Sequence, residues 1–172
     1  MRRLFLLRHA KSSWDDPTLP DFDRPLAPRG MKAARLMGAE MARRGWIADL
    51  ALVSTSVRTR RTWELVAAQW PAPTCDARFT GTIYEARPRD LLAEIRKTGD
   101  RVRCLLVVGH NPGLEMLARD IAGPDSDPAA MQRLAAKFPT AGLASLELEG
   151  AWSDLGEHSA RLTDLLRPRD LD

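Results

Sequence analysis

The stretch Leu4-Phe5-Leu6-Leu7-Arg8-His9-Ala10-Lys11 begins with four apolar residues and passes directly into an arginine and a histidine. The apolar part is far too short for a signal peptide or a membrane span. Short runs that are apolar throughout are typical of strands whose two faces are both covered by helices. The sequence therefore predicts a first strand here, with Arg8 and His9 at its end.

Two further runs of this kind, residues 50–53 and 104–108, alternate along the chain with segments of helical periodicity. Strands that alternate with helices predict an α/β fold with a largely parallel, doubly wound sheet. We expect three layers, α/β/α, with a mostly parallel mixed sheet in the middle. The length of 172 residues suits one domain over residues 1–172, because neither a repeat nor a low-complexity tract divides it.

Four helices are expected around these strands. Met31, Ala34, Met37 and Met41 recur at helical spacing, and Gly45 follows as a stop. The other three helices begin near Ser56, Pro88 and Asn111-Pro112 and run toward Gln69, Lys97 and Ala122. Residues 125–128 are expected to form an exposed loop, and residues 143–149 and 160–166 to form two strands near one edge of the sheet.

The charge pattern argues against nucleic acid as a partner. The formal net charge is +3 and the isoelectric point is near 9.2, but Lys and Arg are scattered among acids and the aromatic residues are few and dispersed. A solvated or phosphate-binding surface fits better. Cys75 and Cys104 lack the paired spacing of zinc or redox sites, so we expect a cytoplasmic protein. We expect no membrane partner and, without a heptad seam, a monomer.

Polar segments follow the three apolar runs. They read Arg8-His9-Ala10-Lys11, Ser54-Thr55-Ser56-Val57-Arg58 and Gly109-His110-Asn111-Pro112-Gly113. Because ligands of open α/β sheets bind outside the carboxyl ends of the strands, we expect two histidines and two arginines at one rim. An imidazole nitrogen can attack phosphorus while guanidinium groups hold the phosphoryl oxygens. This set predicts an anion site for phosphoryl transfer that needs no metal and no cofactor.

The segment Leu6-Leu7-Arg8-His9-Ala10-Lys11 resembles the signature of the histidine phosphatase superfamily, also called phosphoglycerate-mutase-like. Three segments are most similar to the SixA-type phosphohistidine phosphatases in it: Arg8-His9-Ala10-Lys11-Ser12-Ser13-Trp14, Asp23-Arg24-Pro25-Leu26 and Gly109-His110-Asn111-Pro112. The short chain also resembles that branch, since many relatives carry larger insertions around the site. The resemblance covers most of the chain and implies the phosphoglycerate-mutase-like fold.

The resemblance implies roles for five residues. His9 would be the nucleophile that is transiently phosphorylated, while Arg8, Arg58 and His110 would bind the phosphoryl group. Glu85 falls where many relatives hold an acid that protonates the leaving group and later activates water.

Three more polar residues, Lys11, Ser12 and Asn111, are candidates for substrate binding. A flexible polar loop explains Lys11 and Ser12 equally well.

The branch-specific segments and the compact size favour a phosphatase that hydrolyses phosphohistidine in a protein through an intermediate on His9. A small-molecule phosphatase or a mutase with the same nucleophile is an alternative, although the short chain leaves little material for the lid that a mutase needs. A phosphate-binding module without turnover is a second alternative. Metal-dependent hydrolysis with His9 and His110 as ligands is a third, and no zinc-binding motif in the sequence supports it.

Overall fold

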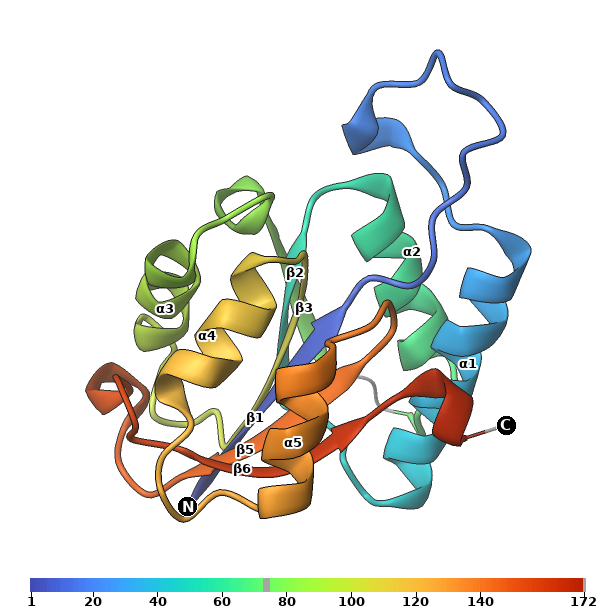
Figure 1. The fold of residues 1–172 in the computed structure, drawn as a ribbon. Coiled ribbons are helices and arrows are strands. Elements are labelled where there is room, and N and C mark those ends of the chain that lie inside the picture. The colour runs from blue at the N-terminus through green and yellow to red at the C-terminus, as the bar shows by residue number, and fades with distance from the viewer. Residues whose placement is uncertain (73–74, 172) are drawn as a thin grey trace.

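The sheet of this protein is mixed, and most of it is parallel. A computed structural model describes residues 1–72 and 75–171, and within them a six-stranded sheet has the order β3-β2-β4-β1-β5-β6 (Figure 1). The strands are β1 (Arg2–Arg8), β2 (Leu50–Ser54), β3 (Asp76–Thr80), β4 (Cys104–Gly109), β5 (Leu143–Leu148) and β6 (Arg161–Leu166). β1 to β4 are parallel, whereas β5 runs antiparallel to both β1 and β6. The predicted fold class is confirmed.

Helices cover both faces of the sheet and give the predicted three layers (Figure 1). They are α1 (Pro28–Arg43), α2 (Val57–Ala67), α3 (Pro88–Arg96), α4 (Gly113–Ile121) and α5 (Pro128–Ala136). Short 3-10 helices are η1 (Asp21–Asp23), η2 (Gly81–Ile83), η3 (Trp152–Asp154) and η4 (Pro168–Asp170). Most buried apolar side chains of α1 and α2 belong to one core, whereas Ala34 and Leu65 belong to a smaller cluster with Leu26; those of α3, α4 and α5 belong to the core on the other face. The four predicted helices are confirmed to within a residue or two at their ends.

Strand β1 connects the two cores. Leu4, Phe5, Leu6 and Leu7 are all fully buried. Leu4 and Leu6 pack into the core beneath α3, α4 and α5, whereas Phe5 and Leu7 pack into the core beneath α1 and α2. Successive side chains of a strand point to opposite faces, so each face of the sheet needs an apolar residue at every second position. This requirement explains why the run is apolar throughout.

One helix was not predicted. Residues 125–127 form the expected loop, with Asp125 and Asp127 exposed, but Ser126 is buried and Pro128 already begins α5, so the prediction fails at these two residues. The Ser126 Oγ accepts a hydrogen bond of 2.9 Å from the backbone N–H of Leu162, at the start of β6. Asp127 caps α5 by accepting from the backbone N–H of Ala130 at 2.9 Å. An Asp-Pro pair occurs in turns as well as at helix starts, so tertiary packing against β6 decides between them.

The two helices beside the predicted site start differently. At α2 the Ser56 Oγ accepts from the backbone N–H of Thr59 at 3.4 Å, as an N-cap residue should. At α1 the N-cap residue is Ala27, which has no side-chain acceptor, although Pro28 at the first position suits a helix start. A side-chain cap contributes about 1 kcal/mol, so α1 depends more on packing.

The C-terminal strands lie where the sequence placed them. β5 and β6 form one edge of the sheet, with a bulge between Ser145 and Leu146. Cys75 directly precedes β3 at the other edge, and both cysteines are free thiols. None of the helices in the described part of the chain is long and apolar enough to cross a membrane.

We expect Leu6→Ala to lower the free energy of unfolding by about 2–5 kcal/mol, because it removes a fully buried side chain from a central strand and leaves a cavity. Urea denaturation followed by circular dichroism measures this. Met116→Ala is the matched control: Met116 is 46% exposed, and its loss should cost less than about 0.5 kcal/mol. Equal costs for the two variants would contradict the central role of β1.

Candidate active site

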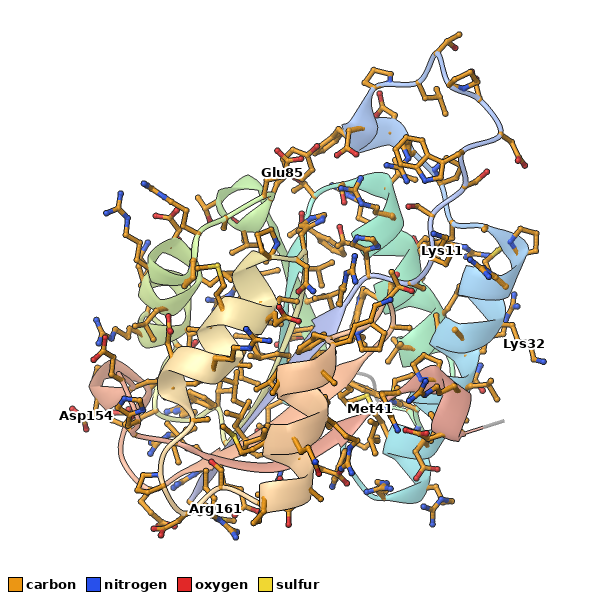
Figure 2. The ribbon with its side chains drawn as sticks, viewed as in Figure 1. Lys11, Lys32, Met41, Glu85, Asp154 and Arg161 are labelled. Atoms are coloured by element: carbon orange, nitrogen blue, oxygen red, sulfur yellow. The ribbon has the colours of Figure 1, made fainter. Side chains whose placement is uncertain are left out.

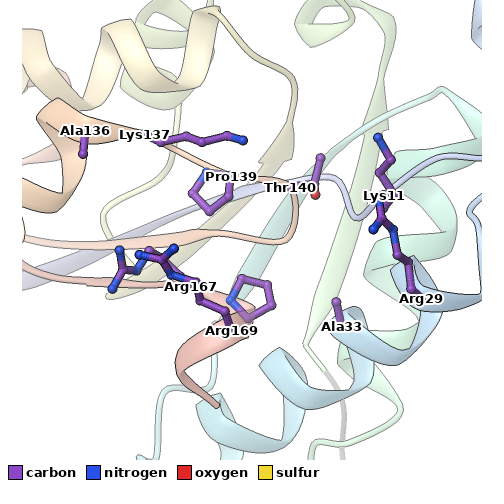
Figure 3. A pocket seen from close by; sticks show the side chains of 10 residues that line it. Lys11, Arg29, Ala33, Ala136, Lys137, Pro139, Thr140, Arg167 and Arg169 are labelled. Carbon is purple, nitrogen blue, oxygen red and sulfur yellow. The ribbon is translucent and has the colours of Figure 1, made fainter. Parts of the chain in front are cut away.

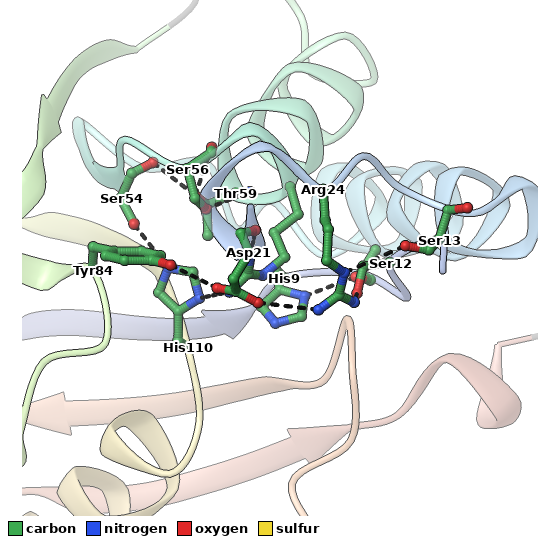
Figure 4. A network of polar contacts seen from close by, with 12 residues as sticks. His9, Ser12, Ser13, Asp21, Arg24, Ser54, Ser56, Thr59, Tyr84 and His110 are labelled. Carbon is green, nitrogen blue, oxygen red and sulfur yellow. Dashed lines mark hydrogen bonds and ion pairs between the residues drawn. The ribbon is translucent and has the colours of Figure 1, made fainter. Parts of the chain in front are cut away.

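His9 directly follows the central strand β1 and lies among polar side chains (Figure 4). Its backbone N–H donates to the carbonyl of Gly109 at 3.0 Å, which ties it to the end of β4. The next residue, Ala10, donates its N–H to the Thr62 hydroxyl at 3.0 Å, and that hydroxyl donates to the carbonyl of Arg58 at 2.7 Å. The backbone on both sides of His9 is therefore held by β4 and α2, and its side chain is only 8% exposed.

The hydrogen bond of the His9 ring defines which nitrogen can react. Nδ1 lies 2.8 Å from the carbonyl oxygen of Ala10. A carbonyl oxygen only accepts, so Nδ1 carries the proton and Nε2 keeps its lone pair. Burial lowers the pKa of His9 to about 4, partly offset by this hydrogen bond and reinforced by the nearby Arg58 and Arg8. At neutral pH His9 is an uncharged imidazole with a free nucleophilic nitrogen.

His110 lies beside His9 at the end of β4. The two ring centroids are 5.4 Å apart, and His110 is 5% exposed. Its Nδ1 lies 3.4 Å from a guanidinium nitrogen of Arg58, which only donates, so Nε2 carries the proton and donates to the Ser54 Oγ at 2.8 Å. Burial, with His9 and Arg58 nearby, lowers the pKa of His110 to about 3.

Arg58 and Arg8 bring the cationic groups that the sequence predicted. Arg58 is in the first turn of α2 and is 5% exposed. Arg8 ends β1, and one of its terminal nitrogens donates to the carbonyl of Phe138 at 3.1 Å. Both charges act on His9 and His110, as their lowered pKa values record. The structure thus brings together His9, Arg8, Arg58 and His110.

Asp21, from η1, is a site residue that the sequence analysis missed. Its carboxylate accepts from Arg58 at 2.9 Å, from Tyr84 at 2.6 Å and from Arg24 at 3.1 Å. Figure 4 shows Asp21 between Tyr84 and Arg24. Its carbonyl also accepts from Arg58 at 2.7 Å. The hydrogen bond from Tyr84, followed by those of the arginines, lowers the pKa of Asp21 to about 2. Asp21 therefore stays ionised and orients Arg58.

Tyr84 and Arg24 complete this network, and the sequence indicated a role for neither of them. The Tyr84 ring packs edge-on against His110 with 5.2 Å between centroids. Arg24 donates to the Ser12 hydroxyl (Figure 4), and its guanidinium carbon lies 3.3 Å from the centroid of the Trp14 ring. Four acids lie at positions 15 to 23, and nothing in the sequence distinguishes Asp21 from the other three. Nothing in the sequence marks Tyr84, which precedes Glu85, as a site residue either.

Of the remaining predicted residues, Ser12 joins the network through Arg24, whereas Glu85, Lys11 and Asn111 lie around it. Glu85 is exposed and makes no hydrogen bond or ion pair within the described residues (Figure 2). Ser12 is buried against Arg24, and Lys11 lies at the rim with no partner for its side chain in the described chain. The Asn111 amide donates to the carbonyl of Phe138 at 3.1 Å, so it supports the same loop as Arg8.

The arrangement suits attack on a phosphoryl group. The neutral imidazole of His9 has a free Nε2, the His110 ring and the charges of Arg8 and Arg58 lie close to it, and His9, Arg58 and His110 are each at most 8% exposed. Donors fixed in advance stabilise developing charge without reorganising. Among residues 1–72 and 75–171, no group of three or more His, Cys, Asp or Glu side chains is placed to hold a metal ion.

Comparison with known proteins agrees with this chemistry. The profile of the histidine phosphatase superfamily (branch 1) matches residues 4–80, which include His9 and Arg58. A crystal structure of a candidate phosphohistidine phosphatase SixA from Agrobacterium tumefaciens is 32% identical, with a TM-score of 0.82 over 97% of this chain and 98% of that one. Its counterpart from Nakamurella multipartitia is 30% identical, with a TM-score of 0.83 over 97% and 96%.

An uncharacterized protein of Mycobacterium tuberculosis is similar over its whole length. It is 38% identical over 164 residues, which cover 95% of this chain and 100% of the relative. The similarity to these three relatives covers 95% or more of this chain and so extends far beyond residues 4–80, which the superfamily profile matches.

We expect the Tyr84 phenol to titrate near pH 12 and its midpoint to fall in Asp21→Asn. Burial raises the pKa of Tyr84 to about 12, and the hydrogen bond to the Asp21 carboxylate adds to this. Tyr84 is the one tyrosine of the chain, so phenolate absorbance in the ultraviolet reports it alone. Burial persists in the variant, so its midpoint should stay above the ordinary value of about 10. The control is the urea-unfolded protein, in which Tyr84 should titrate near the ordinary value of about 10. A midpoint near 10 in the folded wild type as well would contradict the network.

We expect stability to fall as the pH drops from about 6.5 to 4. The pKa values of His9 and His110 are about 4 and about 3 in the folded protein, against about 6.5 when unfolded, so the unfolded state binds more protons in this window. The free energy of unfolding therefore rises with pH in this window. The contribution of the two neutral histidines reaches its full value above about pH 6.5. Urea denaturation across this range should record a loss on the order of 2 kcal/mol per histidine.

His9→Gln is the matched variant for this measurement. It removes one of the two titrating groups, so its pH dependence should be shallower than that of the wild type. Identical slopes for the two proteins would mean that His9 is not buried as a neutral ring.

Proposed function

The chain belongs to the SixA-type branch of the histidine phosphatase superfamily and is a phosphatase, and from this premise we propose that it hydrolyses phosphohistidine in a protein substrate through a phosphorylated His9. The observation that carries the proposal is the hydrogen bond from His9 Nδ1 to the Ala10 carbonyl. This hydrogen bond leaves Nε2 unprotonated and fixes the orientation of the imidazole ring. We include in the proposal that the reaction is metal-independent and that one domain, acting as a cytoplasmic monomer, performs it.

The reaction has two displacements. In the first, the lone pair of His9 Nε2 attacks phosphorus, the P–N bond of the substrate phosphohistidine breaks, and the substrate imidazole leaves with a proton from solvent. In the second, water attacks phosphorus, the bond to His9 Nε2 breaks, and inorganic phosphate leaves with the neutral enzyme restored. The sum is phosphohistidine plus water giving histidine plus phosphate.

Arg8, Arg58 and His110 are the groups we assign to the phosphoryl oxygens. Guanidinium groups bind phosphoryl oxygens through paired donors, and their charge opposes the charge that spreads over these oxygens in the transition state. The low pKa of His110 reflects burial and its cationic neighbours. A phosphoryl dianion would oppose that effect, so His110 is suited to gain a proton when substrate binds.

Asp21 gives this pocket a competitor for the substrate. Its carboxylate binds Arg58, which is the donor that the phosphoryl group needs. A bound phosphoryl group must share Arg58 with Asp21 or displace it. We assign Asp21 to holding Arg58 in place while the site is open.

We assign Glu85 the acid–base role only for substrates whose leaving group needs a proton. It is exposed and outside the hydrogen-bonded network. An imidazole leaves from a phosphoramidate with less protonation than an alkoxide needs, so a dedicated acid is dispensable for P–N bonds and useful for P–O bonds. This difference favours phosphohistidine over phosphoesters as the substrate, and it supplies a test.

We expect His9→Ala to lower turnover of both a phosphohistidine-bearing protein and p-nitrophenyl phosphate by about 1,000-fold or more, since it removes the nucleophile. The assay is run with a chelator throughout, so activity in the wild type supports metal independence. An acid-labile phosphoenzyme should be trapped in the wild type and be absent from the variant. Full turnover by His9→Ala would overturn the mechanism.

Glu85→Gln is the second arm of the same assay. If the acid serves alkoxide leaving groups only, this variant loses turnover of an alkyl phosphate such as glycerol phosphate and keeps that of phosphohistidine and of p-nitrophenyl phosphate, whose phenolate leaves without a proton. Wild-type activity on p-nitrophenyl phosphate with none on phosphohistidine would replace the proposal with a small-molecule phosphatase.

A further inference from the structure

A cationic groove lies beside the active site. Its cavity has a volume of about 510 Å³ and lies between the start of α1, the segment after α5 and η4 (Figure 3). Five cationic side chains line it, and we call these the basic groove: Lys11, Arg29, Lys137, Arg167 and Arg169. No aspartate or glutamate of the described residues is among the side chains that line it.

The groove is joined to the catalytic pocket by backbone contacts. Lys11 is two residues beyond His9, and Gly30 packs so closely on Lys11 that a Cβ there would lie 2.1 Å from the Lys11 carbonyl oxygen. This contact holds the start of α1, and with it Arg29, beside the active-site strand. On the opposite wall, the N–H of Ala141 lies 3.1 Å from the carbonyls of both Arg8 and His9. One wall of the basic groove therefore begins two residues after His9, and the other wall is hydrogen-bonded to the backbone of His9.

The charges of the groove are largely uncompensated. Within the described chain, the side chains of Lys11, Arg29, Lys137 and Arg169 form no hydrogen bond or ion pair, whereas Arg167 pairs with Asp170 at 2.7 Å. Most other arginines of the described residues do have such partners, as Arg43 and Arg133 illustrate. Clustered like charges repel one another and concentrate anions nearby. Four of the five groove cations can therefore attract an anionic group without displacing an ion pair within the described residues.

The construction of the groove favours a protein surface over a small anion. Its cations are on long flexible side chains, and apolar groups of Ala33, Pro139 and Pro168 lie between them. A tight phosphate site instead uses convergent backbone N–H groups or buried, oriented guanidiniums. Exposed cations around an apolar floor are suited to carboxylates that are spread over the surface of a partner.

We propose that the basic groove binds an acidic segment of the phosphorylated protein, next to the phosphohistidine that enters the catalytic pocket. The inference rests on the proposed function and names its substrate class: phosphohistidine flanked by aspartate and glutamate. The groove accelerates the encounter and sets the orientation in which the phosphoryl group meets His9. Because exposed charge pairs are screened by salt, this contribution weakens as ionic strength rises.

The test uses two phosphohistidine peptides of equal length, one flanked by Asp and Glu and the other by Asn and Gln. For the wild type we expect kcat/KM to be about tenfold higher for the acidic peptide at low salt, as several exposed charge pairs together would give. In the triple variant Arg29→Gln, Lys137→Gln, Arg169→Gln this preference should fall below about twofold and lose its salt dependence. Turnover of the neutral peptide and of p-nitrophenyl phosphate should be unchanged.

The matched control removes three charges elsewhere. Arg35, Arg89 and Arg101 are exposed, line no part of the groove and form no ion pair within the described residues. The variant Arg35→Gln, Arg89→Gln, Arg101→Gln has the same net charge as the groove variant and should keep the tenfold preference.

Three results would overturn the inference, and they are distinguishable. If wild type and groove variant share the same preference, or neither has one, the inference fails and the proposed function stands. If the groove variant loses activity equally on both peptides and on p-nitrophenyl phosphate, the cations serve the phosphoryl group or the fold. If the wild type hydrolyses p-nitrophenyl phosphate but neither peptide, the proposed function itself fails, and the inference with it.

Discussion

The burial of β1 on both faces is the constraint on which the rest of this protein depends. Residues 4 to 7 are fully buried, alternately in the two cores, so β1 cannot shift along its neighbours without exposing apolar groups on both sides. Its register with β4 aligns Arg8 with Gly109, which puts His9 and His110 at the same level of the sheet. The position of the two imidazoles is thus a consequence of packing far from them.

A second constraint acts on the charges at the end of that strand. The pocket contains Arg8, Arg24 and Arg58 around two histidines that burial keeps neutral. Asp21 is the one carboxylate that binds two of these arginines in the described structure. Without a counter-charge, buried guanidiniums would repel each other and lose their alignment. Asp21 therefore allows the pocket to be strongly cationic and still ordered, and Tyr84 fixes the carboxylate in turn.

The catalytic pocket and the basic groove divide the recognition of an anion between two environments. Groups inside the pocket are buried and oriented, so they can act on charge that develops at one atom. Most side chains in the groove are exposed, so they act on net charge over a wider area and are sensitive to salt. The loop at residues 137–142 contributes to both, because it lines the groove and is bonded to the backbone of Arg8 and His9.

Features that depend on a local sequence pattern could be predicted from the sequence. Features that depend on contacts between segments far apart in the chain were decided only by the tertiary structure. Residues 4–7, 50–53 and 104–108 were recognisable as buried strands because an apolar residue is needed on each face, and the polar residues after them therefore had to meet at one edge. Helix α5 was missed because an Asp-Pro pair is ambiguous until β6 packs against it. Asp21 could not be distinguished from its acidic neighbours, since only the path of η1 over the site brings its carboxylate to Arg58. The basic groove was equally hidden, because its five cations come from segments that adjoin only after the chain has folded.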